Sequence, residues 1–330
     1  MHHVRLGRTG LPVSRLCLGT MTFGLQCDER AAAAILDRAA AGGITFLDTS
    51  DVYPMGGGLA TAGRTEEILG RWLAGRRHDF IVATKCFGAV GPHPWDRGHS
   101  RKHVLDAIEG SLRRLQTDYV DLYQLHHPDP DTPIDETLRA LDDVVRAGKA
   151  RYVGCSNFPA YKVARALGRS ETLGVARFDS VQPRYNLLYR QIERELLPLC
   201  QEEGLAVIPY NPLAGGLLSG KHRFAAGPTP GTRFAVGGGA RRYQNRYWHE
   251  REFATVEALR PLAAEAGLSL VQLALAWVLA HPAVTAPIVG ASRAEQLDDA
   301  LPALDKPLAP DLKARLDGLT QEYRLGDDPR

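Results

Sequence analysis

The stretch ITFLDTSDVYP, residues 44–54, decides how the chain is interpreted. It begins as a buried strand with alternating apolar side chains, and it then ends abruptly in polar residues and a proline. Asp48 closes the apolar part and Tyr53 follows five residues later. Ionisable side chains at the carboxyl end of a strand are typical of enzymes built on parallel sheets, where that end carries the active site. Two such groups at the end of one strand therefore indicate chemistry, provided that other strands end in the same way.

Seven other runs share this strand-like character, and amphipathic helix-like segments separate them. The eight strand-like runs cover residues 15–20, 44–49, 80–85, 119–127, 151–157, 178–186, 205–213 and 285–292. Helices are predicted over residues 29–43, 65–75, 100–116 and 134–149. Ser100 is placed to cap the third of these helices, and glycines such as Gly148 fall where helices should end.

Strict alternation of strands and helices predicts parallel strands with helical crossovers, either in a doubly wound sheet or in a (β/α)8 barrel. A doubly wound dinucleotide domain should carry G-x-G-x-x-G after an early strand, and no such motif occurs. Eight units without an internal break favour an α/β fold of the (β/α)8 TIM barrel type, as one domain over residues 1–330. A short β-hairpin is expected over residues 3–14, and a long glycine-rich loop over residues 221–251, after strand seven.

Composition argues against several classes of partner. Forty Lys and Arg residues face 38 Asp and Glu residues, which excludes the strong positive charge expected of a nucleic-acid or anionic-membrane partner. The longest apolar run, at 270–280, contains Gln272 and is too short to span a bilayer. Five scattered cysteines without a C-x-x-C pair, and no signal-peptide pattern, predict a soluble cytoplasmic protein. His99 and His103 lack the glutamate of a zinc-protease motif, so no metal site is expected.

Four ionisable residues fall at the carboxyl ends of successive predicted strands: Asp48, Tyr53, Lys85 and His126. Each residue alone is more often explained by packing or solvation, but the four together form an acid–base device. A tyrosine titrates near ~10, so it donates a proton well only when its anion is stabilised. A nearby ammonium provides that stabilisation, a carboxylate keeps the ammonium charged, and a neutral histidine can orient a carbonyl oxygen. These residues predict protonation of a carbonyl oxygen during its reduction.

Seven motifs then resemble, in order, the signatures of the aldo-keto reductase superfamily: SRLCLGTMTFG, LDTSDVY, IVATK, DLYQLHHPD, YVGCSNF, PYNPLAGGLLSGK and IVGASRAEQL. The resemblance spans roughly residues 4–310. It implies a (β/α)8 barrel that binds NADP(H) across its mouth without a Rossmann motif. It also implies that Tyr53 is the general acid, that Lys85 and Asp48 tune it, and that His126 orients the carbonyl.

The resemblance further implies a set of cofactor contacts. Ser156, Asn157 and Gln182 match the positions that hold the nicotinamide carboxamide, and Tyr210 matches the ring that stacks on the nicotinamide. Ser292 and Arg293 are expected to open a helix at the 2′-phosphate. The complete predicted set is Gly19, Thr20, Met21, Asp48, Ser156, Asn157, Gln182, Tyr210, Asn211, Pro212, Leu213, Gly215, Lys221, Arg233, Gly290, Ser292, Arg293, Gln296 and Asp299. The family often has an asparagine where this chain has Ala300, so adenine recognition is expected to be weaker or made differently.

The function expected from these residues is NADPH-dependent reduction of an aldehyde or ketone, with a small-molecule carbonyl substrate. A homo-oligomer is left open. One alternative is a nucleotide-sugar ketoreductase, because residues 221–251 carry arginines and aromatic residues that suit an anionic, ring-bearing substrate. A solvated loop is the simpler interpretation of those arginines, which are Arg223, Arg233, Arg241, Arg242, Arg246 and Arg251. The alternative from another class is a regulatory NADP-binding module that resembles channel β-subunits.

Overall fold

A computed structural model describes residues 1–325, so the last five residues of the predicted domain lie outside the described residues. Eight parallel strands form one sheet in the order β10-β3-β4-β5-β6-β7-β8-β9. Each strand coincides with one of the eight predicted runs, and only β5 and β7 extend one residue beyond theirs. The strands are β3 (Cys17–Gly19), β4 (Phe46–Asp48), β5 (Ile81–Cys86), β6 (Val120–Leu125), β7 (Ala150–Ser156), β8 (Ser180–Gln182), β9 (Ala206–Val207) and β10 (Ile288–Gly290).

The sheet closes on itself between its two end strands, β9 and β10. The backbone N–H of Thr285 donates to the carbonyl of Val207 at 2.8 Å, and the N–H of Ile288 donates to that of Pro209 at 2.8 Å. Isolated parallel bridges join Val207 to Val284 and Tyr210 to Ile288. Closure leaves no unpaired sheet edge. The predicted (β/α)8 barrel is therefore confirmed.

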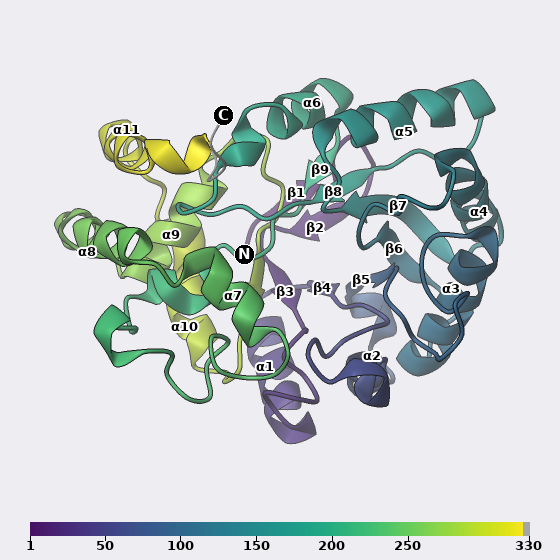
Figure 1. The fold of residues 1–330 in the computed structure, drawn as a ribbon, viewed down its shortest axis with the longest axis horizontal. Coiled ribbons are helices and arrows are strands. Elements are labelled where there is room, and N and C mark those ends of the chain that lie inside the picture. Colours follow the sequence, from purple (N-terminus) through teal and green to yellow (C-terminus); the bar gives the residue numbers. More distant parts are fainter. Residues whose placement is uncertain (326–330) are drawn as a thin grey trace.

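The helices lie outside the strands, around the ring (Figure 1). They are α1 (Glu29–Ala41), α2 (Arg64–Leu73), α3 (Arg101–Leu115), α4 (Ile134–Arg146), α5 (Ala160–Leu173), α6 (Leu196–Glu203), α7 (Ala240–Tyr247), α8 (Glu250–Glu265), α9 (Leu270–Leu279), α10 (Gln296–Ala300) and α11 (Pro310–Leu319). The predicted cap of α3 is confirmed, because the Ser100 hydroxyl accepts the backbone N–H of His103 at 3.3 Å. Gly148 follows α4 with a φ of 72°, as expected for a helix end.

Alternation along the strands divides the buried side chains into two cores. Phe46 and Leu122 belong to the cluster inside the barrel, whereas Leu47 and Tyr123, one position further along, pack against the helices. The predicted N-terminal hairpin consists of β1 (His3–Arg5) and β2 (Pro12–Ser14), which pair antiparallel. Its fully buried Leu6 joins the inner cluster. The hairpin thus covers the end of the barrel opposite to the carboxyl ends of the strands.

The segment 221–251 differs from the predicted continuous loop. It contains a 3-10 turn, η5 (Phe224–Ala226), then α7, and its last residues already belong to α8. Tyr243 and Tyr247 stand four residues apart, so they share one face of α7 and bury it. The Tyr247 hydroxyl accepts hydrogen bonds from Asn186 at 3.1 Å and from Asn211 at 2.9 Å. These anchors explain why a glycine-rich sequence with poor intrinsic helix signals forms a helix here.

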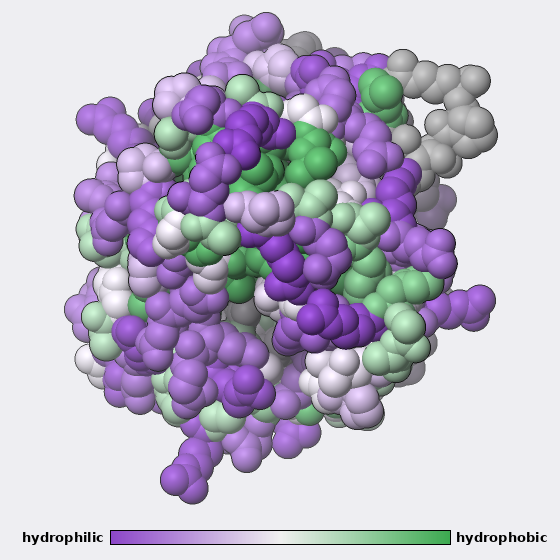
Figure 2. Space-filling model, turned by 90° about the vertical axis from the view of Figure 1, so that its left-hand side faces the viewer, coloured by the Kyte–Doolittle hydropathy of each residue, from purple (hydrophilic) through white to green (hydrophobic). Residues whose placement is uncertain are grey.

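Figure 2 shows the side of the molecule on which α8 and α10 lie, where hydrophilic side chains cover most of the surface around a smaller hydrophobic area. Within residues 1–325, no single helix is long and apolar enough to cross a membrane. The pair α8 and α9 reaches the required length and composition only together, with a bend of 88° between the two helices.

Candidate active site

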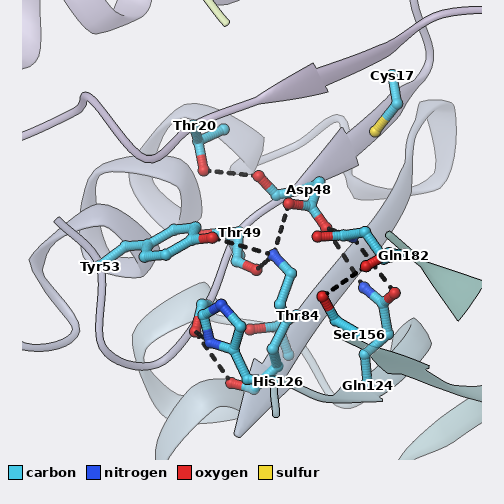
Figure 3. Close-up of polar contacts among 12 residues, drawn as sticks. Cys17, Thr20, Asp48, Thr49, Tyr53, Thr84, Gln124, His126, Ser156 and Gln182 are labelled. Carbon is cyan, nitrogen blue, oxygen red and sulfur yellow. Dashed lines mark hydrogen bonds and ion pairs between the residues drawn. The ribbon is translucent and has the colours of Figure 1, made fainter. Parts of the chain in front are cut away.

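Three adjacent strands deliver the four predicted catalytic residues to one end of the barrel. Asp48 is the last residue of β4, Lys85 lies next to the end of β5, and His126 directly follows β6. Tyr53 reaches back over the same end from the connection after β4. The side chains of Tyr53, Asp48 and His126 face a common centre in Figure 3. The structure therefore brings together all four residues that the sequence singled out.

The ammonium of Lys85 is fully buried and lies at the centre of this group. Its Nζ donates to Asp48 Oδ2 at 2.6 Å, to the carbonyl of Thr49 at 2.7 Å, and to the Tyr53 hydroxyl at 3.4 Å. Burial lowers the pKa of Lys85, but the charges of Asp48 and Tyr53 and the hydrogen bonds to them outweigh burial, so the pKa lies above its ordinary value. Lys85 is thus a permanent cation in contact with the tyrosine hydroxyl.

Tyr53 is held as a neutral phenol. Burial raises its pKa to about 12, although the Lys85 ammonium acts in the opposite direction. With this pKa, the phenol keeps its proton at neutral pH. When the phenol donates the proton, the Lys85 ammonium is already in place to stabilise the phenolate. The side chain is therefore equipped to donate one proton and to be left as a stabilised anion.

His126 is neutral in this environment. Burial and, next, the Lys85 ammonium hold the pKa of His126 well below its usual range. Its ring lies edge-on to Tyr53, with the ring centres 5.7 Å apart and an interplanar angle of 77°. A neutral imidazole this close to the phenol can donate one N–H to the oxygen that the phenol protonates.

The predicted nicotinamide contacts also gather at this end of the barrel. Asn157, with a φ of 64°, donates to the Ser156 hydroxyl at 3.0 Å and to the carbonyl of His126 at 2.9 Å. The Tyr210 hydroxyl donates to Asn157 Oδ1 at 2.8 Å. Thr20 lies beneath Asp48, to whose carbonyl its hydroxyl donates at 2.9 Å. The neighbouring predicted residues Gly19 and Met21 flank Thr20 at the end of β3. The ends of β3, β7, β8 and β9 therefore surround the catalytic group.

A backbone cradle follows β9. Asn211 and the glycines of η4 (Ala214–Ser219) adopt positive φ angles, 72° at Gly215 and 102° at Gly216. A Cβ at Gly215 would lie 2.7 Å from the ring of Tyr243, so only glycine fits there. The Asn211 side chain accepts the N–H of Gly215 at 2.6 Å and fixes the turn. Predicted residues Pro212 and Leu213 form the start of this cradle.

Three predicted cations lie near one another beyond the cradle. Burial lowers the pKa of Lys221, and the neighbouring charges of Arg293 and Arg233 lower it further. Arg233 extends toward Gly290, where an added Cβ would lie 3.7 Å from its Nη2. Within residues 1–325, none of the three cations forms an ion pair with a carboxylate. Such a cluster lacks its counter-charge and suits a phosphate.

Comparison with known proteins agrees with this geometry. Residues 15–321 match the model of a family described as the Aldo/keto reductase family. The chain belongs to this family.

Individual relatives align over most of their length with this aldo/keto reductase. The "Uncharacterized oxidoreductase YrpG" of Bacillus subtilis (strain 168) is 41% identical, over 92% of this chain and 91% of its own. A "Probable voltage-gated potassium channel subunit beta" of Arabidopsis thaliana is 38% identical, over 92% of each chain. The "Versiconal hemiacetal acetate reductase" of Aspergillus parasiticus is 32% identical, over 94% of each chain.

Two residues that sequence reasoning missed contact the predicted catalytic histidine, His126, directly or through one another. The Ser50 hydroxyl lies 3.2 Å from His126 Nδ1 and 3.2 Å from Asp51 Oδ1. Asp51 is buried, and its Oδ2 has no hydrogen-bond partner among the described residues. Burial and then the nearby Glu66 hold the pKa of Asp51 well above its ordinary value. Burial therefore favours the protonated, neutral form of the Asp51 carboxyl.

A neutral Asp51 sets the direction of this hydrogen-bond chain. Its carboxyl O–H can donate to the Ser50 hydroxyl, which leaves the Ser50 proton free to be donated to His126 Nδ1. His126 then carries its own proton on Nε2. If Asp51 were ionised, Ser50 would donate to the carboxylate, and the histidine proton would move to Nδ1. The Lys85 carbonyl, 3.4 Å from the Ser50 hydroxyl, is a second acceptor for that proton, and only donation to Nδ1 fixes the tautomer whose Nε2–H can contact a substrate.

The carboxylate of Asp48 has two further amide partners in the aldo/keto reductase barrel. Gln182 Nε2 donates to Asp48 Oδ1 at 2.8 Å, and Gln124 Nε2 donates to the same oxygen at 3.3 Å. The sequence assigned Gln182 to the cofactor and overlooked Gln124, and the structure shows both amides oriented toward Asp48 (Figure 3). Gln124 could have been found from its spacing, because it stands two residues before His126 in a strand.

The predicted helix at the 2′-phosphate begins later than expected. Helix α10 starts at Gln296 and has only five residues, so Ser292 and Arg293 lie in the turn that precedes it. The reason is local: Gln296 Oε1 accepts the backbone N–H of Ser292 at 2.8 Å and thereby closes the turn. Asp299, predicted to contact adenosine, accepts the Ser269 hydroxyl at 2.7 Å. No group of three or more His, Cys, Asp or Glu residues in the described chain is arranged to hold a metal ion.

Proposed function

We propose that this aldo/keto reductase reduces an aldehyde or ketone to an alcohol with NADPH. The observation that carries the proposal is the buried contact of the neutral Tyr53 hydroxyl with Lys85 Nζ, 3.4 Å apart. The ammonium is itself fixed by Asp48 at 2.6 Å. The neutral phenol of Tyr53 lies beside the Lys85 cation and the neutral His126 ring. This arrangement suits the protonation of a carbonyl oxygen that gains negative charge during reduction.

Each of the four residues has its own role in the proposed reduction. His126 donates Nε2–H to the carbonyl oxygen and so orients the carbonyl toward Tyr53. Tyr53 gives its proton to that oxygen, and Lys85 neutralises the phenolate that remains. Asp48 keeps Lys85 charged, and the amides of Gln182 and Gln124 hold Asp48 in place. NADP(H), when bound, would supply the two electrons as hydride to the carbonyl carbon.

The residues present fit a dinucleotide phosphate. The glycines of η4, with their positive φ angles, would let a pyrophosphate approach the backbone closely. The cations Lys221, Arg233 and Arg293 lack carboxylate partners in residues 1–325, so a 2′-phosphate would provide their missing counter-charge. Ser156 and Asn157 would hold the carboxamide and Tyr210 would stack on the nicotinamide. Gln182, which donates to Asp48, has its Oε1 left for that contact. This supports NADPH over NADH.

A regulatory role is the second candidate, because two of the relatives are named as probable voltage-gated potassium channel β-subunits, at 38% identity. The complete group of Asp48, Tyr53, Lys85 and His126 favours turnover as the primary function. Catalytic turnover of a carbonyl panel separates the two candidates, since a purely regulatory module would bind NADPH without oxidising it in the presence of carbonyl substrates.

The variant Tyr53→Phe tests the proposed reductase activity. It keeps the ring and removes the acid, so kcat for carbonyl reduction should fall by about a hundredfold to ten-thousandfold, the usual contribution of general acid catalysis. NADPH affinity, measured by fluorescence, should stay near the wild-type value because other residues hold the cofactor. Tyr119→Phe is the matched control, because this hydroxyl lies at the surface near His78. Retention of more than about a tenth of wild-type kcat by Tyr53→Phe would remove Tyr53 from the mechanism.

A further inference from the structure

Helix α7 is anchored beside the opening of the barrel. Its Tyr243 lies against Gly215 in the cradle, and the Tyr247 hydroxyl accepts hydrogen bonds from Asn186 after β8 and from Asn211 after β9. The helix is thus attached to the same connections that border the catalytic group. Its remaining side chains include Arg242 and Arg246, which stand one turn apart on one face.

A cavity of about 550 Å³ lies between α7 and the ends of β7, β8 and β9. Asn157 and Tyr210, the residues proposed to contact the nicotinamide, form part of its wall. Arg184 and Arg246 also line it. The cavity therefore adjoins the proposed nicotinamide contacts and is bordered by two partly buried guanidinium groups, those of Arg184 and Arg246.

Within residues 1–325, neither guanidinium group has a carboxylate counter-charge. The Arg184 guanidinium lies 3.4 Å from the ring centre of Tyr189 and is partly buried. Burial lowers the pKa of Arg184, but Tyr247 and Tyr189 raise it overall, so the charge is retained. Among the described residues, neither Arg184 nor Arg246 forms an ion pair with a carboxylate. A partly buried charge without a partner costs free energy, and an anionic ligand recovers it.

The remaining charges of the cavity do not neutralise it. Glu195 is the only carboxylate among the cavity-lining residues within 1–325, and it is exposed. Arg194 lines the cavity as well and is also exposed. Two exposed groups of opposite charge screen each other through water, which leaves the charges of Arg184 and Arg246 in excess.

The positive charge extends to the catalytic histidine. After burial, the charges of Arg242 and Arg246 lower the pKa of His127, and Arg242 also contributes to lowering the pKa of His126. Burial raises the pKa of Tyr210, and Arg246 acts against that rise. The arginines of α7 therefore place a positive potential over the end of the barrel where His126 and His127 lie.

We propose that Arg184 and Arg246 form a subsite for an anionic group, a carboxylate or a phosphate, on the carbonyl substrate. The subsite holds this group in the cavity while the carbonyl reaches Tyr53 and His126. The aromatic rings of Tyr189 and Tyr210 make the walls suitable for a flat or unsaturated body between the two ends. The inference rests on the proposed carbonyl reduction and narrows its substrates to anionic carbonyl compounds.

Matched substrates test the subsite. 4-Carboxybenzaldehyde is compared with its neutral methyl ester, and 4-formylphenyl phosphate with 4-methoxybenzaldehyde, by kcat/KM of the NADPH-loaded enzyme. The anionic member of each pair should be preferred, and added salt should reduce the preference. The two pairs show whether a carboxylate or a phosphate fits the arginines better.

Variants assign the preference to the two arginines. Arg246→Gln and Arg184→Gln should each lower kcat/KM for the anionic substrates by about tenfold to a hundredfold and leave the neutral partners within about threefold. Arg241→Gln is the matched control, since it removes one charge from the same helix at an exposed position that does not line the cavity. Binding of 4-methylbenzoate to the NADP⁺ complex, measured by calorimetry, should weaken in parallel without any turnover.

Three outcomes overturn the inference. Equal losses for anionic and neutral substrates show that the arginines do not recognise the substrate's charge. A matching loss of NADPH affinity shows that they bind the cofactor's pyrophosphate instead. Tight binding of 4-methylbenzoate by both variants leaves the arginines without a role in binding anions. Failure of the wild type to reduce any carbonyl contradicts the proposed function alone, because the calorimetric measurement still reports on the subsite.

Discussion

The hydroxyl of Ser50 carries a single proton and lies 3.2 Å from both His126 Nδ1 and Asp51 Oδ1. Which neighbour receives that proton decides which ring nitrogen of His126 is protonated. A protonated Asp51 donates to Ser50 and leaves the Ser50 proton for His126 Nδ1 or for the Lys85 carbonyl, 3.4 Å away. We therefore propose that Ser50 and Asp51 are positioning residues, which would act on a substrate only through the histidine.

The variant Ser50→Ala tests this role. Without the hydroxyl, His126 is free to adopt either tautomer, and kcat should fall by about tenfold, equivalent to one lost hydrogen bond of about 1.4 kcal/mol. Nitrogen NMR of the His126 ring should show a shift from the Nε2–H form toward a mixture, a change that a merely structural role would not produce.

Conservative variants serve as controls for Ser50→Ala. Ser50→Thr keeps the hydroxyl and Asp51→Asn keeps a neutral donor toward Ser50, so both should retain the wild-type tautomer. An unchanged tautomer in Ser50→Ala would refute the proposed hydrogen-bond chain.

At the scale of single residues, the sequence revealed the side chains whose chemistry is unusual at a strand end. Tyr53, Lys85 and His126 were predicted because ionisable groups interrupt apolar runs. Ser50 and Asp51 stand in the same polar stretch, but short polar residues there are ordinary turn formers. Their role depends on how the connection after β4 folds back toward β6, and that path is a tertiary property.

Three separate connections deliver the predicted phosphate-binding cations. Lys221 follows η4, Arg233 lies before α7, and Arg293 follows β10. Their mutual repulsion is tolerable because each side chain is partly exposed, but it lowers the pKa of Lys221. A bound phosphate would convert this repulsion into attraction.

The variant Arg293→Ala should therefore weaken NADPH binding far more than NADH binding. A charge-assisted contact to phosphate contributes roughly 1.5–3 kcal/mol, which corresponds to about tenfold to a hundredfold in Kd. Fluorescence titration of each cofactor gives both Kd values. Arg223→Ala is the control because Arg223 already pairs with Glu257, at 3.2 Å. Equal losses for NADPH and NADH would place Arg293 away from the 2′-phosphate.

The periodicity of apolar residues predicted those helices and strands that bury one face against the barrel. The eight strands and the four helices named from the sequence are present, although β8 to β10 are only two or three residues long. The sequence did not predict α7. This helix is stabilised by Tyr243, which packs on η4, and by Tyr247, which is bonded to Asn186 and Asn211, and not by intrinsic propensity. The sequence prediction also started the helix after β10 too early. The side chain of Gln296 accepts the Ser292 N–H and closes a turn before the helix begins.

For the whole molecule, the histidines predict sensitivity to acid. Burial is the main cause of a lowered pKa in six of the histidines. In two of them, His99 and His222, the pKa is lowered to about 4. The others are His103, His126, His127 and His281. Below about pH 6.5 the unfolded chain protonates these residues and the native chain does not. Stability is therefore lost as the pH falls from about 6.5 toward the folded pKa values.

Two buried acids act in the opposite direction. Burial raises the pKa of Asp179 to about 6 and that of Asp51 well above its ordinary value, so the native protein keeps protons there that the unfolded chain releases. Six histidines outweigh two acids. His99 alone, which is fully buried, contributes about 2 kcal/mol of stability at pH 7 that is lost at pH 5.

Urea unfolding at pH 7 and pH 5 measures the balance. The midpoint should be lower at pH 5. The double variant His99→Gln/His222→Gln should reduce the difference between the two pH values, even if it lowers stability at both. A midpoint at pH 5 equal to or above that at pH 7 would show that the acids dominate.

The junction that closes the barrel has one further consequence. The strands β9 and β10 meet through isolated bridges and a few backbone hydrogen bonds, whereas β6 and β7 pair at five positions. Amide exchange and protease cleavage begin where the fewest hydrogen bonds resist local opening. The cradle after β9 and Arg293 after β10 stand on the two sides of this junction. A dinucleotide held by both sides adds its binding free energy to the free energy of opening the ring, so cofactor release and loss of barrel closure form one linked equilibrium.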